Sequence, residues 1–429
     1  MANTCSAVNW WMRSSYSATN FRNVNTNGNA NNNNASNTNN WLRPALRKLI
    51  GTRFEARKGA VPVIQSTNAV ISKGGTQAIM VFTYSMLYDA WKKTVVQSSN
   101  EPNRAKYKYY LEDHIHYIIS SIEDMTFTPK PMRNKTIYFP KKRNVQVPTI
   151  DDKIVQHAIC DNYLYERVTK PLIKETSACL IGRGDGYASK IMAGNLRRYY
   201  AKNGSEFYAL KCDIHHYFAT IDHEKIAPLI ERYVDDDVVK WIMWKYIGMM
   251  PKGLALGLQQ SQLLANLFLS GLDHMIKEDL GAKFYGRHMD DFYILSDSKE
   301  YLYGCLSRIT EYLNGLGLEL NPKTAVFSNA ISFLGFTYSM TDKGRVVKRL
   351  DKGKRNTKRK QLKKKISELK DGKLSTDKFA DSYQGWRSHA LNGDCAALVH
   401  TWDEWINADL SSAGYNMVIK GNRIIIGRK

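Results

Sequence analysis

The chain has 429 residues, 43% of them hydrophobic, and its excess of Lys and Arg gives a formal net charge of +22. This length is sufficient for two or three domains with sizeable cores. So large a positive charge indicates a polyanionic partner, with nucleic acid as the first candidate and an anionic membrane surface as the second. No apolar run approaches the roughly 20 residues of a membrane span and the N-terminus lacks a signal-peptide pattern, so we expect a cytoplasmic protein without a membrane partner.

The N-terminal segment, residues 1–45, is rich in Asn and contains Gly, Ser and Thr, which can bury little apolar surface. We therefore expect it to be disordered. The cysteines are scattered without a CxxC pair, which predicts reduced thiols, with neither a disulfide framework nor a zinc site.

The first half of the chain alternates helical patterns with short strands. We expect helices over 80–93, 104–123, 151–168 and 188–201, and strands over 135–140, 144–148 and 207–213. A basic turn, 141–143, joins the first two strands, and a Gly-rich loop, 182–186, precedes the fourth helix.

The second half contains an apolar hairpin over 284–296 between helical segments. We expect helices over 223–233, 236–246, 259–280 and 299–316, and short strands over 318–320 and 331–338. The remainder is basic and helical, with 352–370 carrying most of its charge.

Three carboxylates stand at strand ends in this pattern. Asp213 ends a buried strand, and Asp290 and Asp291 are adjacent at the centre of the hairpin. Adjacent acids in a tight turn repel each other, which implies a divalent counter-ion. A solvated hairpin tip is the alternative for the pair alone. With Asp213 on a neighbouring strand, the three acids could bridge two metal ions about 3.5–4 Å apart, as phosphoryl transfer to a 3′-hydroxyl requires.

Five segments in order resemble the motifs of reverse transcriptases. Residues 210–223, with Asp213, resemble the first palm motif, and 286–292 resemble the metal-binding turn. Residues 256–266 resemble the helix that supports template and incoming nucleotide, and 317–324 and 333–336 resemble the later palm motifs. The resemblance implies an α+β right-hand RNA-directed DNA polymerase, with fingers over 46–205, a palm of antiparallel sheet and helices over 206–340, and a basic helical thumb over 341–429.

The resemblance also implies roles for individual residues. Two Mg²⁺ ions, for which Mn²⁺ could substitute, would be held by Asp213, Asp290, Asp291 and the Ile214 carbonyl. Phe218 would exclude a 2′-hydroxyl, so that deoxynucleotides are favoured. The dNTP would be bound by Lys142, Arg143, Lys153, Phe218 and Gln262. Template RNA and the RNA–DNA hybrid would contact Gly257, Ser261, Gln262, Asn266, His288, Met289, Lys354, Arg355, Lys358 and Arg359.

Within the family, Leu256-Gly257 and Ser261-Gln262 are similar to the enzymes of diversity-generating retroelements, which copy a template RNA with errors at adenines. Residues 382–389 resemble the C-terminal motif of that branch. This similarity implies a bacterial or phage-encoded enzyme and a small basic accessory protein as partner. The Asn-rich residues 1–45 resemble a translated template repeat, and an unrelated disordered tail is the alternative.

His288 departs from the Tyr that the family usually carries before its acidic pair. Two rival functions therefore stay open. One is an antiviral, retron-like or group II intron-like bacterial reverse transcriptase, and the other is a catalytically inactive RNA-binding scaffold.

Overall fold

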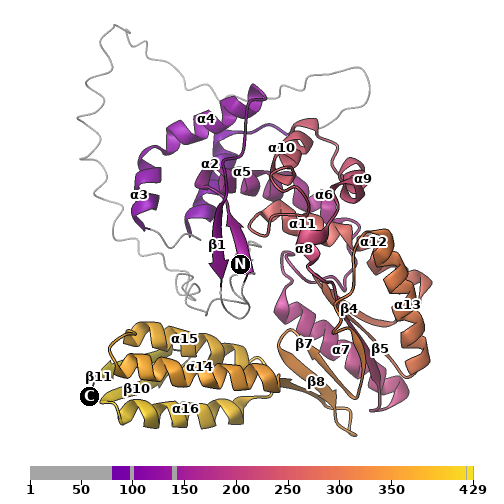
Figure 1. Ribbon diagram of the computed structural model, residues 1–429, viewed down its shortest axis with the longest axis vertical. Helices are drawn as coiled ribbons and strands as arrows, with labels where there is room; N and C mark the ends of the chain where they lie inside the picture. The colour runs from indigo at the N-terminus through magenta and orange to yellow at the C-terminus, as the bar shows by residue number, and fades with distance from the viewer. Residues whose placement is uncertain (1–79, 97–100, 138–142, 422, 429) are drawn as a thin grey trace, which may run out of the picture. The chain divides into compact units, whose positions relative to one another are not determined.

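The computed structural model describes residues 80–96, 101–137, 143–421 and 423–428, which form α-helices and antiparallel β-sheets (Figure 1). The mixed α and β composition expected from the sequence is confirmed. The expectations for residues 1–45 and for Lys142 lie outside the described residues.

Three helices begin the described chain: α2 (Tyr84–Val96), α3 (Glu101–Tyr109) and α4 (Leu111–Glu123). The single helix expected over 104–123 is wrong, because the backbone at Tyr110 (φ −105°, ψ 22°) leaves the helical range and separates α3 from α4. Leu111, Ile115 and Ile118 recur at helical spacing and are buried, which is why α4 packs by one face.

An antiparallel hairpin follows, in which β1 (Arg133–Ile137) pairs with β2 (Arg143–Val147). The helix expected over 151–168 is confirmed, as α5 (Ile150–Ile159), a π-helical segment η4 (Cys160–Leu164) and α6 (Tyr165–Thr169). Thr149 caps α5 by accepting a hydrogen bond from the Asp152 N–H.

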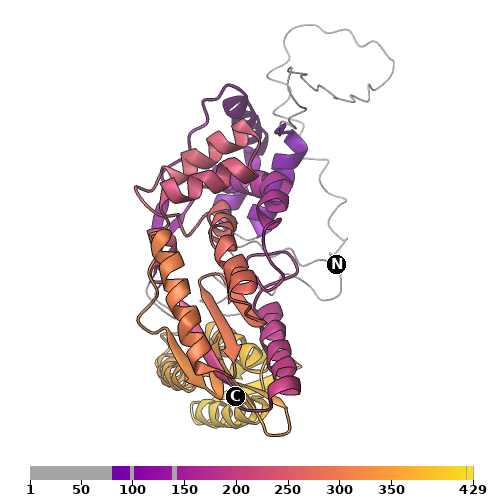
Figure 2. The same ribbon diagram turned by 90° about the vertical axis from the view of Figure 1, so that its right-hand side faces the viewer.

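A four-stranded antiparallel sheet has the order β4-β5-β3-β6, with β3 (Tyr208–Asp213), β4 (Phe284–His288), β5 (Asp291–Ser296) and β6 (Ala325–Ser328). Two helices, α7 (Asp185–Asn203) and α13 (Lys299–Gly315), lie on either side of it in Figure 2. Leu210 and Cys212 of β3 join the core that contains α13, whereas Ala209 joins the core that contains α7. This alternation is the period-2 pattern of a strand buried on both faces.

The chain between β3 and β4 is helical: α8 (Tyr217–Thr220), α9 (His223–Tyr233), α10 (Asp237–Ile247), α11 (Gln259–Phe268), α12 (Ser270–His274) and the π-helical η5 (Met275–Asp279). The helix expected over 259–280 is divided at Leu269, where the backbone (φ −95°, ψ 4°) leaves the helical range.

A second sheet of three antiparallel strands contains β7 (Ala330–Phe333), β8 (Phe336–Met340) and β9 (Val346–Leu350). The strand expected over 331–338 is instead the hairpin of β7 and β8. Leu334 and Gly335 have φ of 50° and 88°, so they form its two-residue turn.

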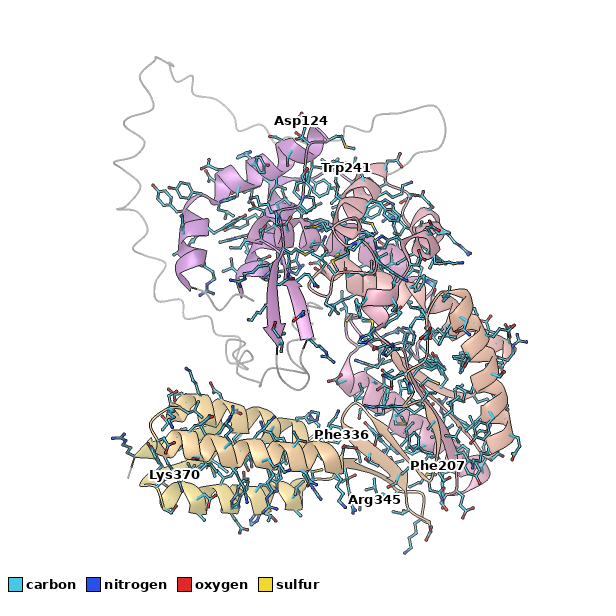
Figure 3. The ribbon with its side chains drawn as sticks, viewed as in Figure 1. Asp124, Phe207, Trp241, Phe336, Arg345 and Lys370 are labelled. Carbon is cyan, nitrogen blue, oxygen red and sulfur yellow. The ribbon has the colours of Figure 1, made fainter. Side chains whose placement is uncertain are left out.

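The C-terminal bundle contains α14 (Lys352–Lys370), α15 (Thr376–Ala390), α16 (Ala396–Ser411) and a terminal hairpin of β10 (Tyr415–Lys420) and β11 (Arg423–Arg428). The region expected to be helical therefore also carries β9, β10 and β11. Ile366, Phe379 and Trp402 belong to its buried core. Phe336, labelled in Figure 3, packs against His389 with their ring centroids 4.7 Å apart, and this contact joins β8 to α15.

None of the helices in the described part of the chain is long and apolar enough to cross a membrane. The cysteines among the described residues are free thiols.

Candidate active site

The central sheet brings the three predicted carboxylates together. Asp213 ends β3 and is the Cα partner of Asp291, which begins β5. Asp290 directly precedes Asp291 in the turn between β4 and β5. Antiparallel pairing of β3 with β5 therefore brings all three acids together at one end of the two central strands.

The turn that carries Asp290 is a tight one. His288 pairs with Asp291, so Met289 and Asp290 form a two-residue hairpin loop. Met289 has φ of 60°, a conformation that costs a non-glycine residue about 1–2 kcal/mol. The Arg287 guanidinium donates to the Met289 carbonyl at 3.0 Å and so holds this conformation.

The carboxylates at this turn repel each other in a poorly hydrated setting. Burial, with the charges of Asp213 and Asp291, raises the pKa of Asp290 to about 7. Burial likewise raises the pKa of Asp291 to about 6, although Lys211 lies 3.5 Å away and opposes the shift. Within the described residues, the buried Oδ1 of Asp291 has no hydrogen-bond partner.

These features fit a divalent cation by chemistry, although no closed coordination shell is formed. Among the residues that the structure describes, no group of three or more His, Cys, Asp or Glu side chains is arranged to hold a metal ion. Mg²⁺ retains water and is usually held by one or two carboxylates together with substrate phosphates, so a preformed protein cage is not required. The unpartnered oxygen of Asp291 and the raised pKa values are the local signs of a missing positive charge.

Ile214 lies beside these acids. It forms an antiparallel bridge with Leu320, in which the hydrogen bonds are made by the neighbouring residues: the Asn321 N–H donates to the Asp213 carbonyl, and the His215 N–H donates to the Glu319 carbonyl. The bridge therefore does not use the carbonyl of Ile214.

The hairpin of β1 and β2 contributes cations. Burial lowers the pKa of Arg143, and the charge of Asp290 acts on it in the opposite direction, so the two side chains lie within electrostatic range. Lys153 of α5 is half-buried, and its pKa is lowered by burial and by the charges of Arg133 and Lys135. Lys153 therefore lies within electrostatic range of Arg133 and Lys135 of β1, and such a group of positive charges is a favourable environment for an anion.

Phe218 and Gly257 are packed closely against backbone. Phe218 is 6% exposed in the one-turn helix α8, and its carbonyl accepts from the Leu254 N–H at 2.7 Å. A Cβ at Gly257 would lie 1.5 Å from the Gln146 carbonyl oxygen of β2. Only glycine allows the segment before α11 to approach the hairpin so closely.

The predicted polar contacts of α11 are buried. Ser261, Gln262 and Asn266 are at most 2% exposed. Gln262 accepts from the Cys179 thiol at 3.0 Å, and Asn266 donates to the Ala178 carbonyl at 2.7 Å. In this structure the side chains of Gln262 and Asn266 contact residues 178–179, so an effect of Gln262 on the template would pass through its neighbours.

His288 and Met289 are buried as well, at 3% and 1% exposure. The His288 ring pairs with the Ser177 hydroxyl at 2.9 Å, and its Nε2 lies 3.5 Å from the Asp185 carboxylate. Burial, with the neighbouring charge of Arg287, lowers the pKa of His288 to about 3, so the ring is neutral. The ring of His288 thus faces the protein interior in this structure, and its expected contact with template RNA and the RNA–DNA hybrid stays a prediction.

The predicted cations of α14 lie in different environments. Lys354 is within electrostatic range of Asp291 and Asp185, and its Nζ lies beside the Gly335 turn. Arg359 is exposed above the Trp405 ring. Lys358 instead points at α15 and donates to the Ser382 carbonyl at 3.2 Å. Arg355 is half-buried.

Sequence reasoning missed the buried residues behind the turn. Asp273 of α12 forms an ion pair with Arg287, and both side chains are fully buried. Arg287 lies within the segment 286–292 that resembles the metal-binding turn. Asp273 lies in an ordinary helical pattern, and nothing in the sequence around it indicates a buried ion pair.

Parts of the chain are similar to known proteins. Residues 129–338 match the family described as reverse transcriptase (RNA-dependent DNA polymerase). Residues 1–47 match a different family, described as a domain of unknown function. The group II intron-encoded protein LtrA of Lactococcus lactis subsp. cremoris is 25% identical over 182 residues, which cover 39% of this chain and 29% of that protein. This chain thus spans less than a third of that curated relative.

Solved structures of telomerases are also similar. A truncated apo telomerase from Candida tropicalis aligns with a TM-score of 0.41 and 13% identity, covering 53% of this chain and 58% of that one. A telomerase from Candida albicans in complex with a fragment of telomeric RNA aligns with a TM-score of 0.44 and 11% identity, covering 72% and 59%.

Proposed function

We propose that this chain, which carries a reverse transcriptase domain over residues 129–338, is an RNA-directed DNA polymerase that adds deoxynucleotides to a 3′-hydroxyl on an RNA template. The observation that carries the proposal is the pairing of Asp213 with Asp291 across β3 and β5, with Asp290 in the adjoining turn. Carboxylates presented from adjacent strands suit the in-line displacement at a phosphorus atom that polymerisation requires.

Asp213, Asp290 and Asp291 would hold Mg²⁺, with Mn²⁺ as a substitute. The ions, when bound, supply charge that lowers the pKa of the attacking hydroxyl and stabilises the leaving pyrophosphate. Arg143 and Lys153 would bind the triphosphate, because Arg143 lies within electrostatic range of Asp290 and Lys153 belongs to the cation cluster at the hairpin. The buried ring of Phe218 would limit space beneath the sugar of the incoming nucleotide.

In this proposal the hairpin of β1 and β2 belongs to the fingers, the central sheet to the palm, and the C-terminal bundle to the thumb. The exposed cations of α14 would follow the backbone of the RNA–DNA hybrid, which proteins recognise by charge and shape. The cytoplasmic location expected from the sequence remains part of the proposal.

We further propose that the enzyme belongs to a diversity-generating retroelement and copies template adenines with errors. Support comes from the Leu256-Gly257 and Ser261-Gln262 pattern. It also comes from the N-terminal 47 residues, which match a family other than reverse transcriptases. A template repeat read in frame would add a segment that is unrelated to the polymerase. Sequencing the flanking DNA tests this subtype: a near-copy of the first 45 codons that differs at adenines is expected, and its absence would refute the hypothesis.

A group II intron-like enzyme is the alternative, favoured by the 25% identity to LtrA. The decisive distinction is whether errors concentrate at template adenines. Deep sequencing of the cDNA made on a template of equal base composition would show such a concentration in a diversity-generating enzyme, and a uniform error spectrum in the alternative.

Primer extension tests the polymerase activity itself. We expect magnesium-dependent incorporation of dNTPs by the wild type and a loss of at least about 10³-fold in Asp290→Ala/Asp291→Ala, because the variant would lack carboxylates that hold the metal ions at the transferring phosphate. Binding of a template–primer duplex serves as the control and is expected to persist in the variant. Equal incorporation by both proteins would refute the catalytic role of these carboxylates, and no incorporation by either protein would favour the inactive RNA-binding scaffold.

A further inference from the structure

Arg287 occupies a fully enclosed position directly behind the turn of the three carboxylates. Its Nε donates to one oxygen of Asp273 at 2.6 Å, and its Nη2 lies 2.5 Å from the other. The same carboxylate accepts from the Tyr285 hydroxyl at 2.6 Å and from the Thr176 hydroxyl at 2.9 Å. Asp273 thus accepts hydrogen bonds from two residues of β4, Tyr285 and Arg287, and from Thr176 in the segment that bridges to β4.

The other edge of the guanidinium faces the turn. Nη1 donates to the Met289 carbonyl at 3.0 Å and to the Asn266 Oδ1 at 3.3 Å, and Nη2 also donates to the Asn266 carbonyl. One planar group therefore ties α12, the end of α11 and the residue before Asp290 to each other. A planar fork of five donors can make these contacts at once, whereas a lysine ammonium carries its three donors on one atom.

The backbone of the same residue fixes the strand. The Arg287 N–H donates to the Glu175 carbonyl at 3.1 Å, and the Arg287 carbonyl accepts from the Ser177 N–H at 3.0 Å. β4 thereby gains a short extra pairing at its last residues. The side chain and the backbone of Arg287 together leave the turn little freedom to move.

A buried ion pair of this kind is an inefficient way to stabilise a fold, because desolvation offsets most of the attraction between the charges. Its location suggests another purpose. Met289 adopts a positive φ in the two-residue loop that carries Asp290, and Arg287 donates a hydrogen bond to its carbonyl.

We propose that Arg287, clamped by Asp273, is a positioning residue that fixes the turn and thereby the mutual placement of Asp290, Asp291 and Asp213. This inference rests on the proposed function in treating these carboxylates as metal ligands. Residues behind a metal site that orient its ligands alter metal affinity or activity by about 10- to 100-fold when they are changed.

The chain contains a matched control. In the C-terminal bundle, Arg387 pairs with Asp403 at 3.0 Å, and Asp403 accepts from the Tyr383 hydroxyl at 2.7 Å. This Tyr–Asp–Arg group repeats the chemistry of Tyr285, Asp273 and Arg287 in another part of the fold.

The test measures Mn²⁺ binding to the full chain by electron paramagnetic resonance, with Asp290→Asn/Asp291→Asn identifying the signal of the site. We expect Arg287→Lys to weaken binding about 10- to 100-fold, and Arg387→Lys to leave it unchanged. Circular dichroism confirms that each variant is folded. If Arg287→Lys does not fold, the milder Tyr285→Phe, with Tyr383→Phe as its control, is expected to weaken binding about threefold through a looser Asp273.

Binding of Mn²⁺ by folded Arg287→Lys or Tyr285→Phe with wild-type affinity would overturn the positioning role. Equal weakening by the thumb-side controls would also overturn it, because the effect would then be general. Primer extension separates this result from the proposed function: a wild type that binds Mn²⁺ at the carboxylates but extends no primer would refute the polymerase and leave the role of Arg287 intact.

Discussion

Replacing Gly257 by alanine tests how the hairpin of β1 and β2 is held against α11. The new Cβ would lie 1.5 Å from the Gln146 carbonyl oxygen and 2.7 Å from its carbonyl carbon. A normal contact is about 3.5 Å, so the two backbone segments must separate by about 2 Å. Because both partners are backbone, no side-chain rotation relieves the clash, and we expect a loss of about 1–3 kcal/mol in the free energy of unfolding.

The same displacement should reach the nucleotide site. β2 carries Arg143 three residues before Gln146, so a shift of β2 would move the guanidinium away from the triphosphate that we propose it binds. Lengthening a charge contact from about 4 to 6 Å at an effective dielectric constant of about 20 loses about 1.4 kcal/mol, or tenfold. We therefore expect the KM for dNTP to rise about tenfold while kcat changes less.

The assays are urea denaturation and steady-state primer extension, with Gly194→Ala as the control. Gly194 lies within α7 and a Cβ there would meet nothing within 4 Å, so alanine should stabilise the protein by about 0.5–1 kcal/mol. Unchanged stability and unchanged KM in Gly257→Ala would refute the packing of β2 against the segment before α11.

Three further predictions concern His288, Lys358 and the exposed cations of α14. His288→Tyr should lower the unfolding free energy by about 1–3 kcal/mol, because the larger ring must enter a buried site beside Ser177; an unchanged denaturation midpoint would contradict this. Burial, with the charge of Lys365, lowers the pKa of Lys358 to about 8. Between pH 8 and 10.5 the unfolded chain therefore binds more protons than the folded chain. The stability of the wild type should rise with pH over that range relative to Lys358→Met. If the difference in unfolding free energy between the wild type and Lys358→Met were the same at pH 8 and pH 10, Lys358 would not be desolvated. Changing the exposed Lys360, Lys363 and Lys364 to Gln should reduce the slope of log affinity against log salt for a template–primer duplex by about 2–3, and a constant slope would place the duplex elsewhere.

Much of the secondary structure and the three acids were predictable from the sequence. β3 and β5 are short apolar runs, of which β3 ends at Asp213 and β5 begins at Asp291, so the strands and the positions of the three acids follow from local patterns. The breaks were not predictable. Tyr110 and Leu269 are ordinary residues for a helix interior, and the chain leaves the helical conformation at them without a Gly or Pro as a signal.

The sequence by itself determined which acids could meet, because residue order and strand ends constrain which side chains reach one edge of an antiparallel sheet. Only the tertiary structure decided which polar residues face inward. Gln262, Asn266 and His288 are polar residues of the kind that contact nucleic acids. In the structure, however, they are buried by packing against residues 177–179. The pairing of Asp273 with Arg287 was likewise invisible, because it joins a helix to a strand and depends on how the two pack. Local sequence patterns specify elements and their faces, whereas burial of a polar side chain depends on partners that are distant along the chain.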